Sequence, residues 1–185
     1  MFLDIEASSM KGDTGQITAI GIIKDDKTEV KFVDIPENEK EALEWLKKEL
    51  EGCNLIVSWW GSGFDLPFIL SRAIINGVDL HELLQIPSLD LCKFCQQNLS
   101  LANYSLREVA KSFNIKKDLE ISGKDVLKLY LKAVRGDEKA KETIVNHCRD
   151  DLIVLKEIFH KLEKYINSWR DFHERKRNTQ SSVKF

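Results

Sequence analysis

The sequence predicts an α/β domain whose mixed β-sheet is flanked by helices. Three strand-like segments open the chain at residues 1–6, 17–23 and 30–33, and the short turns between them are typical of an antiparallel meander. After this meander, apolar segments of strand length alternate with segments of helical periodicity. Such an alternation indicates parallel strands joined by crossover helices, so the whole sheet is expected to be mixed.

Length and composition fit one globular domain. The chain has 185 residues, of which 43% are hydrophobic and 31% charged, which is enough to bury a full core. The net charge is −2, so no overall basic field indicates a nucleic-acid partner, although a site rich in carboxylates would lower this total. No apolar run approaches the roughly 18 residues of a membrane span, and no signal peptide opens the chain, so we expect a cytoplasmic protein.

The later elements follow from periodicity and capping signals. Buried strands are predicted at residues 55–59 and 87–91, and Ser105-Leu106-Arg107-Glu108 is a capping box at the start of a helix. The predicted helices cover residues 39–50, 65–76, 106–113, 122–134 and 137–166, the last region as two helices meeting near Asn146. We expect the folded domain to span residues 1–168 and a frayed basic tail to span residues 169–185. The tail carries Arg170, Arg175, Lys176, Arg177 and Lys184 against Asp171 and Glu174.

The cysteines are expected to be reduced structural thiols. Cys92 and Cys95 form one CxxC motif, which would also suit a redox pair or half of a zinc site. No second CxxC motif and no closely spaced pair of histidines completes a zinc site, so the structural role is favoured.

Two carboxylates stand inside the first strand. Asp4 and Glu6 alternate with Leu3 and Ile5, and residues two apart on a strand point to the same face. Two buried carboxylates repel each other unless a positive charge lies between them, and Mg²⁺ is a cation that prefers oxygen ligands. The alternative is an exposed acidic strand end, which this stretch alone does not exclude.

A third candidate, Asp65, follows a Gly-Ser-Gly loop that leaves the predicted strand at 55–59. It opens a helix with Pro67 in the first turn. Asp and Pro are both favoured at helix N-termini, so a capping role is the plain alternative to a functional one.

The last predicted helix carries His147 and Asp151 one turn apart. Residues at i and i+4 are neighbours on a helix, so the two can form a surface ion pair or combine a metal carboxylate with a proton acceptor. Either Asp150 or Asp151 can face inward; the spacing to Leu152 and Leu155 favours Asp151.

Together these motifs resemble those of the DEDD superfamily of 3′–5′ exonucleases, which have a ribonuclease H-like fold. The chain presents Asp4-Ile5-Glu6, Phe64-Asp65-Leu66-Pro67 and His147-x-x-x-Asp151 in the order of the three family motifs. The subgroup most similar to it is the exonuclease domain of family B DNA polymerases, which also has a segment like residues 105–110. The resemblance covers about residues 1–165.

The resemblance implies roles for individual residues. It assigns Asp4, Glu6, Asp65 and Asp151 to two divalent ions, Mg²⁺ or Mn²⁺, and His147 to activation of the attacking water. The substrate-binding residues that it implies are Ala7, Ser8, Met10, Trp60 and Phe64. Three positions depart from the family: His147 combines the histidine of one subgroup with the spacing of another, Trp60 replaces a common Asn, and Ala7 replaces a common Thr.

The implied function is hydrolysis of phosphodiester bonds from the 3′ end of a nucleic acid. Single-stranded DNA is the favoured substrate because the second and third motifs are polymerase-like, with RNA as the second choice. A catalytically inactive nucleic-acid-binding domain is the alternative outside enzymes, and the presence of all four carboxylates with His147 argues against it.

Overall fold

The computed structural model describes the backbone of residues 1–117, 121 and 123–181, and side chains as far as residue 169 apart from those of residues 123 and 124. Within this part of the chain, no helix is both long enough and apolar enough to cross a membrane. Most of the predicted basic tail therefore has a described backbone, while its side chains from residue 170 onwards lie outside the description.

A five-stranded mixed sheet forms the centre of the molecule, as predicted. Its strands are β1 (Phe2–Ala7), β2 (Ile17–Lys24), β3 (Lys27–Phe32), β4 (Ile56–Ser58) and β5 (Ser88–Asp90). Their order in the sheet is β3-β2-β1-β4-β5. The first three strands pair antiparallel, whereas β1 pairs parallel with β4 and β4 pairs parallel with β5.

Helices connect and cover the strands. The 3₁₀ helices are η1 (Pro36–Asn38) and η2 (His81–Leu84). The α-helices are α1 (Glu39–Glu49), α2 (Asp65–Asn76), α3 (Leu91–Asn98), α4 (Leu106–Ser112), α5 (Gly123–Ala133) and α6 (Glu138–Ser181). The sequence had not predicted α3, which contains the CxxC motif. Burial raises the pKa of Cys92 to about 11 and that of Cys95 to about 12, so both thiols are protonated at neutral pH.

The prediction of two helices meeting near Asn146 was wrong. Helix α6 runs without a break from Glu138 to Ser181, a stretch that contains neither Gly nor Pro. The side chain of Asn146 accepts a hydrogen bond from Arg149 in the same helix and does not interrupt it. The helix also continues past residue 168, so the division into a domain and a tail stays a prediction.

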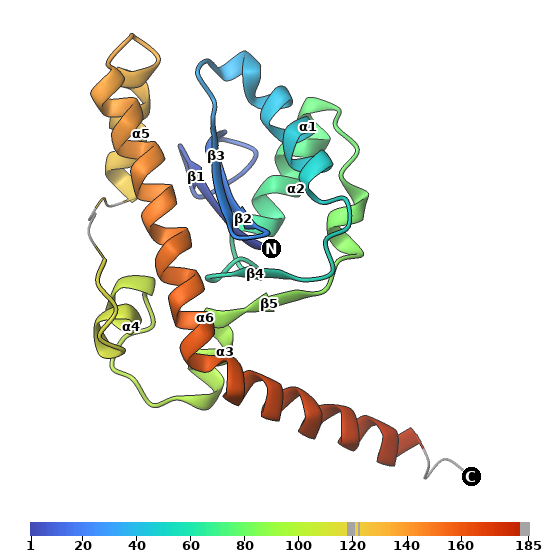
Figure 1. Ribbon diagram of the computed structural model, residues 1–185. Helices are drawn as coiled ribbons and strands as arrows, with labels where there is room; N and C mark the ends of the chain where they lie inside the picture. The colour runs from blue at the N-terminus through green and yellow to red at the C-terminus, as the bar shows by residue number, and fades with distance from the viewer. Residues whose placement is uncertain (118–120, 122, 182–185) are drawn as a thin grey trace.

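The sheet is sandwiched between two layers of helices (Figure 1). Leu3 and Ile5 point into the core that β1 shares with α1 and α2. On the opposite face, the ring of Phe2 packs edge-on against Phe159 of α6, with ring centroids 5.5 Å apart. Because side chains alternate along a strand, Asp4 and Glu6 share the face of Phe2 and look toward α6.

One glycine allows α6 to approach the sheet closely. Gly21 pairs with Asp4 across β2 and β1. A Cβ atom at Gly21 would lie 2.5 Å from the Sγ of Cys148 and 2.7 Å from a methyl group of Leu152. Only a residue without a side chain fits there, and the resulting contact brings the 147–151 turn of α6 over the two carboxylates of β1.

Candidate active site

The candidate site lies where the parallel strands end. Glu6, Ser58 and Asp90 stand at or next to the carboxyl ends of β1, β4 and β5, and these ends share one edge of the sheet. A β-bulge between Glu6 and Ala7 interrupts the pairing with β2 at the same place. Bulges of this kind commonly re-aim side chains beside functional sites.

Asp4 and Glu6 both contribute carboxylates to this edge, and they differ in exposure. Glu6 is 8% exposed, whereas Asp4 is partly exposed and accepts a hydrogen bond from the thiol of Cys148. An exposed acidic strand end, the alternative considered from the sequence, does not describe Asp4 and Glu6, because both lie between the sheet and α6.

Asp65 reaches the same edge from α2. It is the first residue of the helix and is 4% exposed, and its Oδ1 accepts a hydrogen bond from the backbone N–H of Ile5 at 3.1 Å. That N–H is available because β4 pairs with β1 only near Phe2. The carboxylate therefore lies against β1, and helix capping alone does not account for its position.

His147 and Asp151 complete the group from α6. The Nε2 atom of His147 lies 3.7 Å from a carboxylate oxygen of Glu6, and its Nδ1 lies 3.6 Å from Oδ1 of Asp151. The ring is 8% exposed, and among the described residues its Nδ1 has no hydrogen-bond partner. The structure therefore brings the five predicted catalytic and metal-ligating residues together, and their roles stay predictions.

Lys117 is a member of this group that sequence reasoning missed. Its ammonium forms a close ion pair with Asp151 and lies 3.3 Å from Oδ2 of Asp150. Both aspartates thus contact Lys117. Of the two, only Asp151 is among the charges that raise the pKa of Asp4 and Glu6. Nothing in the local sequence marks Lys117, because it follows α4 in a segment without periodicity and approaches the site only through the fold.

Burial and the charges of neighbouring carboxylates raise the pKa values of three acids in this group. Burial raises the pKa of Asp4 well above its usual range, and the charges of Asp65, Glu6 and Asp151 raise it further. Burial, together with Asp151 and Asp65, raises the pKa of Glu6 to about 8, against the opposing effect of Lys117. Burial also raises the pKa of Asp65 to about 7, although backbone hydrogen bonds oppose the shift.

The pKa of His147 is shifted in the opposite direction, downwards. Burial lowers its pKa, and the neighbouring charge of Asp151 only partly offsets this effect. The imidazole is therefore neutral at pH 7, a state in which one ring nitrogen can accept a proton.

A loop that contains Trp60, Ser62 and Gly63 borders the acids and is held by hydrogen bonds to Asp90. We call it the braced loop. The carboxylate of Asp90 accepts hydrogen bonds from the backbone N–H groups of Trp60 and Ser62 and from the hydroxyl of Ser62. Trp60 has a backbone φ of 57°, and its ring lies so close to Gly63 that a Cβ there would be 2.6 Å from the indole nitrogen. The sequence had not indicated Asp90, because nothing near it in the chain gave its carboxylate an evident partner.

The braced loop forms one wall of a groove of about 740 Å³. Trp59, Trp60, Tyr104 and Leu106 line this groove, and Asp151 lies at its edge with the acids. The indole nitrogen of Trp59 donates a hydrogen bond to the carbonyl of Tyr104, which holds the two aromatic residues together. The aromatic groove therefore offers flat apolar surfaces next to the carboxylates.

The other predicted substrate-binding residues surround the end of β1. Met10 is 63% exposed on the loop after β1, so it is not packed in the core. The backbone N–H of Gln16 donates a hydrogen bond to the hydroxyl of Ser8, which closes this loop beside Ala7. Phe64 is half-buried and its ring packs on Phe68 at 5.3 Å. Among the residues predicted for the substrate, Trp60 alone lines the aromatic groove.

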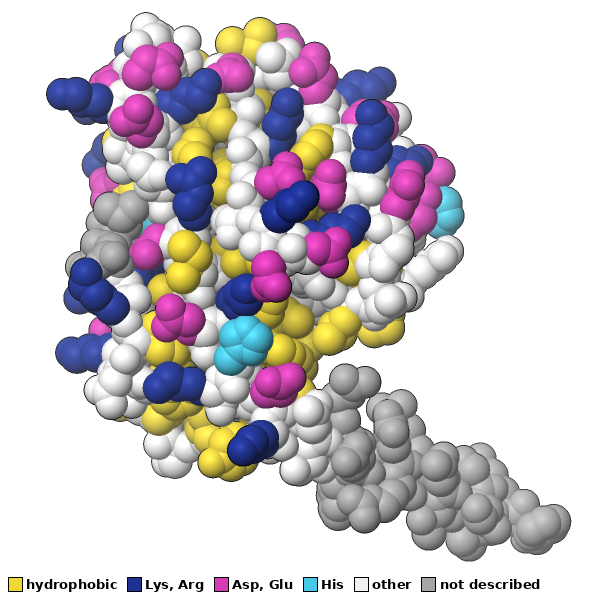
Figure 2. Space-filling view, in the orientation of Figure 1, with side chains coloured by type: hydrophobic (Ala, Val, Ile, Leu, Met, Phe, Trp, Pro, Cys, Tyr) yellow, Lys and Arg dark blue, Asp and Glu magenta, His cyan; other side chains and the backbone are white. Residues whose placement is uncertain are grey.

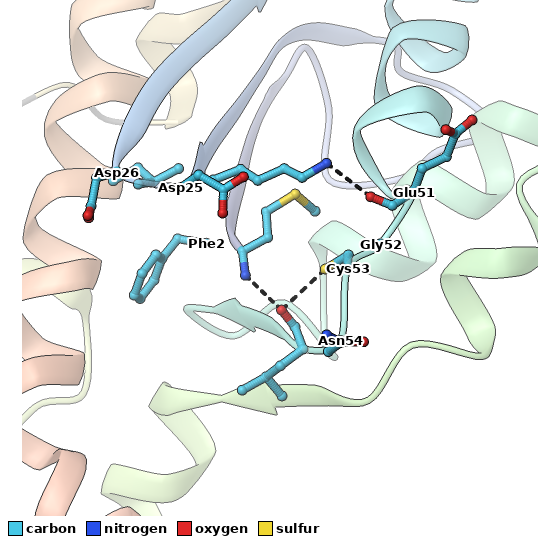
Figure 3. Close-up of a pocket in the computed structure, with 11 residues that line it drawn as sticks. Phe2, Asp25, Asp26, Glu51, Gly52, Cys53 and Asn54 are labelled. Carbon is cyan, nitrogen blue, oxygen red and sulfur yellow. Dashed lines mark hydrogen bonds between the residues drawn. The ribbon is translucent and has the colours of Figure 1, made fainter.

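Two other features of the surface do not coincide with the predicted site. A cavity of about 710 Å³ lies near the amino end of β1, with Phe2, Asp25, Asp26 and Glu51 around it (Figure 3). Asp79, His81 and Glu82 bring possible metal-ligating atoms within 4.8 Å of one another, but Asp79 and His81 are exposed. This surface cluster lies on and just before η2, ahead of β5, and so belongs to the opposite edge of the sheet from the acids.

Comparison with known proteins agrees with this architecture. The family model described as the RNase_H superfamily matches residues 1–163. A solved structure of the family B DNA polymerase from the hyperthermophilic archaeon Pyrobaculum calidifontis matches 85% of the chain with a TM-score of 0.69 at 17% identity. The chain spans 24% of that polymerase, and no curated protein matches its sequence. The predicted ribonuclease H-like fold is thus confirmed, and the chain belongs to the RNase_H superfamily.

Proposed function

We propose that this protein is a metal-dependent 3′–5′ exonuclease that acts on single-stranded DNA. The observation that carries the proposal is the convergence of Asp4, Glu6, Asp65 and Asp151, four carboxylates from three distant parts of the chain. Burial raises the pKa of Asp4, Glu6 and Asp65, and neighbouring carboxylates raise each of these values further, which is a cost that folding alone does not require. The proposed 3′–5′ direction rests on the order of the three motifs along the chain.

The donor set fits divalent metal ions. Asp4, Glu6, Asp65 and Asp151 supply oxygen ligands without sulfur, which suits Mg²⁺ or Mn²⁺. The ammonium of Lys117 is paired with Asp151, so this carboxylate already has one cation beside it. When bound, two such ions supply activation of the attacking water and stabilisation of charge on the leaving oxygen.

Residues of the chain itself transfer the proton and hold the reacting groups in position. His147 accepts a proton from the water at Nε2, the ring nitrogen that faces Glu6, because burial keeps the imidazole neutral. Asp151 lies beside Nδ1 and orients the ring when that nitrogen carries the proton. Asp65 is itself held in place by the backbone of β1 through Ile5.

The aromatic groove supports a single-stranded substrate. Trp60 is 45% exposed and its backbone N–H donates a hydrogen bond to Asp90, so an unpaired base can stack on its ring. Stacking on an aromatic side chain contributes about 1–3 kcal/mol per base and does not depend on the base. Phe64, the residue before Asp65, and Met10, on the loop after β1, are proposed to contact the terminal nucleotide.

Digestion of end-labelled oligonucleotides tests the proposal. Single- and double-stranded DNA and RNA are incubated with Mg²⁺, Mn²⁺ or EDTA, with the 3′ or the 5′ end blocked in turn. We expect stepwise shortening of single-stranded DNA from a free 3′ end, lost in EDTA and in Asp4→Asn. Preferential degradation of RNA would make the protein an exoribonuclease. Binding without any degradation would make it a nucleic-acid-binding domain.

A further inference from the structure

The braced loop depends on one side chain, that of Asp90 at the carboxyl end of β5. Asp90 pairs in register with Ser58, the last residue of β4, so it stands where the chain leaves β4 for the braced loop. Its Oδ1 accepts hydrogen bonds from the backbone N–H groups of Trp60 at 3.0 Å and Lys93 at 3.1 Å. Its Oδ2 accepts from the N–H of Ser62 at 3.2 Å and from the hydroxyl of the same residue. One carboxylate therefore ties the braced loop to β5 and to the first turn of α3.

These hydrogen bonds hold the backbone of Trp60 in a conformation that it would not otherwise favour. Its φ of 57° is left-handed, which is disfavoured about 5- to 30-fold for a residue with a side chain. Hydrogen bonds to a carboxylate are stronger than those between neutral groups, so Asp90 can offset this preference. The backbone conformation sets the direction of the Cα–Cβ bond, and with it the side of the loop from which the indole reaches Gly63 and the aromatic groove.

The position of this ring matters because the charge of the molecule does little to attract a nucleic acid. The net charge of the chain is −2, and acidic and basic side chains are interspersed over the face shown in Figure 2. Affinity for an unpaired strand should therefore depend strongly on stacking, and the ring of Trp60 is exposed in the aromatic groove.

We propose that Asp90 is a positioning residue for the substrate, which keeps the indole of Trp60 where an unpaired base can stack on it. The inference rests on the proposed function and adds to it a residue that acts on the strand only through Trp60. Without Asp90, only a fraction of the molecules would hold the braced loop in the binding conformation. The apparent affinity for the strand falls in proportion to that fraction.

A double-mutant cycle tests whether Asp90 acts through Trp60. Binding of a labelled 12-nucleotide single strand is measured by fluorescence anisotropy, with Asp4→Asn present throughout to prevent degradation. Trp60→Ala should weaken binding about 5- to 150-fold, which corresponds to the loss of one stacked base. Asp90→Ala should weaken it about 5- to 30-fold, and by no more than Trp60→Ala does.

The two losses should not multiply. In the Trp60→Ala background, Asp90→Ala should weaken binding by less than about twofold, because the ring that Asp90 positions is already gone. Ser62→Ala removes one of the four hydrogen bonds and should cost less affinity than Asp90→Ala. If Asp90→Ala weakens binding by the same factor with and without Trp60, Asp90 does not act through this ring and the inference is overturned.

A matched control removes an aspartate that caps a different helix. The Oδ1 of Asp137 accepts a hydrogen bond from the backbone N–H of Ala140 at 3.1 Å, as Asp90 does from Lys93. Asp137 stands just before α6, about 20 Å along the helix axis from Asp151. Asp137→Ala changes the net charge equally and should leave Kd within about twofold of the parent. An equal loss of affinity in both variants would mean that charge or helix capping is responsible, and the inference would fail.

Kinetics separate failure of this inference from failure of the proposed function. Without Asp4→Asn, Asp90→Ala should raise KM for the 12-nucleotide strand by more than it lowers kcat. A wild-type protein that degrades DNA, with Asp90→Ala binding the strand as tightly as its parent, overturns this inference alone. A protein that binds the strand with the expected cycle but never degrades it overturns the proposed function alone.

A second variant keeps the test usable if Asp90→Ala does not fold by circular dichroism. Asp90→Asn retains one oxygen that can accept from Trp60 and loses the acceptor for the N–H of Ser62. It should weaken binding less than Asp90→Ala is expected to, and this loss should again disappear in the Trp60→Ala background. Unchanged affinity in Asp90→Asn and in Ser62→Ala would overturn the inference.

Discussion

His147 is the side chain at which the chemistry of the site can be tested most directly, because its ring lies between Glu6 and Asp151. If it accepts the proton from water, His147→Ala should lower the rate about 10²–10⁴-fold. The wild-type rate should fall at acidic pH, where the imidazole becomes protonated, and this limb should lie below the ordinary histidine range because burial lowers the pKa of His147. The acidic limb should vanish in the variant. Initial rates between pH 5 and pH 9 measure both effects.

Two other positions on α6, His160 and Asp150, serve as controls for His147. His160→Ala removes an exposed histidine of the same helix and should leave the rate unchanged. Asp150→Ala should be nearly silent, whereas Asp151→Ala should be inactive. A reversal of the two aspartates would mean that the wrong face of α6 had been assigned to the site, and the proposed role of His147 would fail with it.

The raised pKa values of the acids predict how stability changes with pH. In the folded protein, burial raises the pKa of Glu6 from its ordinary value of 4.5 to about 8 and that of Asp65 from 3.8 to about 7. At pH values between the ordinary and the raised pKa of each acid, the folded state holds more protons than the unfolded state, so stability falls as pH rises. The lowered pKa of His147 acts in the opposite direction, but only below 6.5. In EDTA, the melting temperature should therefore decline from pH 6.5 to pH 8.

Neutral variants check the cause of that decline. Asp65→Asn and Glu6→Gln remove one titrating group each, so each variant should flatten the curve above pH 6.5. Equal slopes in the variants and the wild type would show that other groups control the pH dependence.

At the scale of elements, Glu39 at the start of α1 connects several parts of the fold. Its side chain is 1% exposed, accepts a hydrogen bond from the backbone N–H of Ile17 on β2, and forms an ion pair of 2.6 Å with Arg72 of α2. Arg72 in turn donates to the carbonyl of Gly12, in the loop that carries Met10.

Glu39→Ala should therefore be strongly destabilising. Removal of Glu39 leaves the N–H of Ile17 without an acceptor and, among the described contacts, leaves the charge of Arg72 with only its hydrogen bond to Gly12, which costs about 3–5 kcal/mol. Glu41→Ala, an exposed position of the same helix, should change stability by less than about 0.5 kcal/mol. Urea unfolding followed by circular dichroism measures both values. A loss below about 1 kcal/mol for Glu39→Ala would show that water replaces its contacts.

The elements also show where sequence reasoning succeeds and where it fails. Strong alternation located β1 with its two carboxylates, and capping signals located α2 and α4. Helix α3 has eight residues, too few for a clear period, and its cap is Asp90, whose side chain also serves the loop at Trp60. Lys117 approaches Asp151 only after α4 and α6 have packed, a contact over 34 positions that no local pattern encodes.

For the molecule as a whole, metal binding should appear as added stability. An ion that binds only the folded state stabilises it by about 2.7 kcal/mol at a concentration 100 times its Kd. The melting temperature should thus rise with the concentration of Mn²⁺ and lose this response in Asp4→Asn. Asp79→Asn, in the surface cluster on and before η2, should keep the full response. If Asp79→Asn abolishes it and Asp4→Asn does not, the ion binds at the surface cluster.

The left-handed backbone of Trp60 has an energetic consequence. A φ of 57° costs a non-glycine residue roughly 1–2 kcal/mol, so the hydrogen bonds that the loop donates to Asp90 hold it against conformational strain. Asn tolerates this region far better than a bulky aromatic residue. Trp60→Asn should therefore release the strain and keep or raise the melting temperature, while it removes a stacking surface and weakens binding of single-stranded DNA. If Trp60 stacks on a base as proposed, the strain in this loop is the cost of holding a binding surface for the substrate.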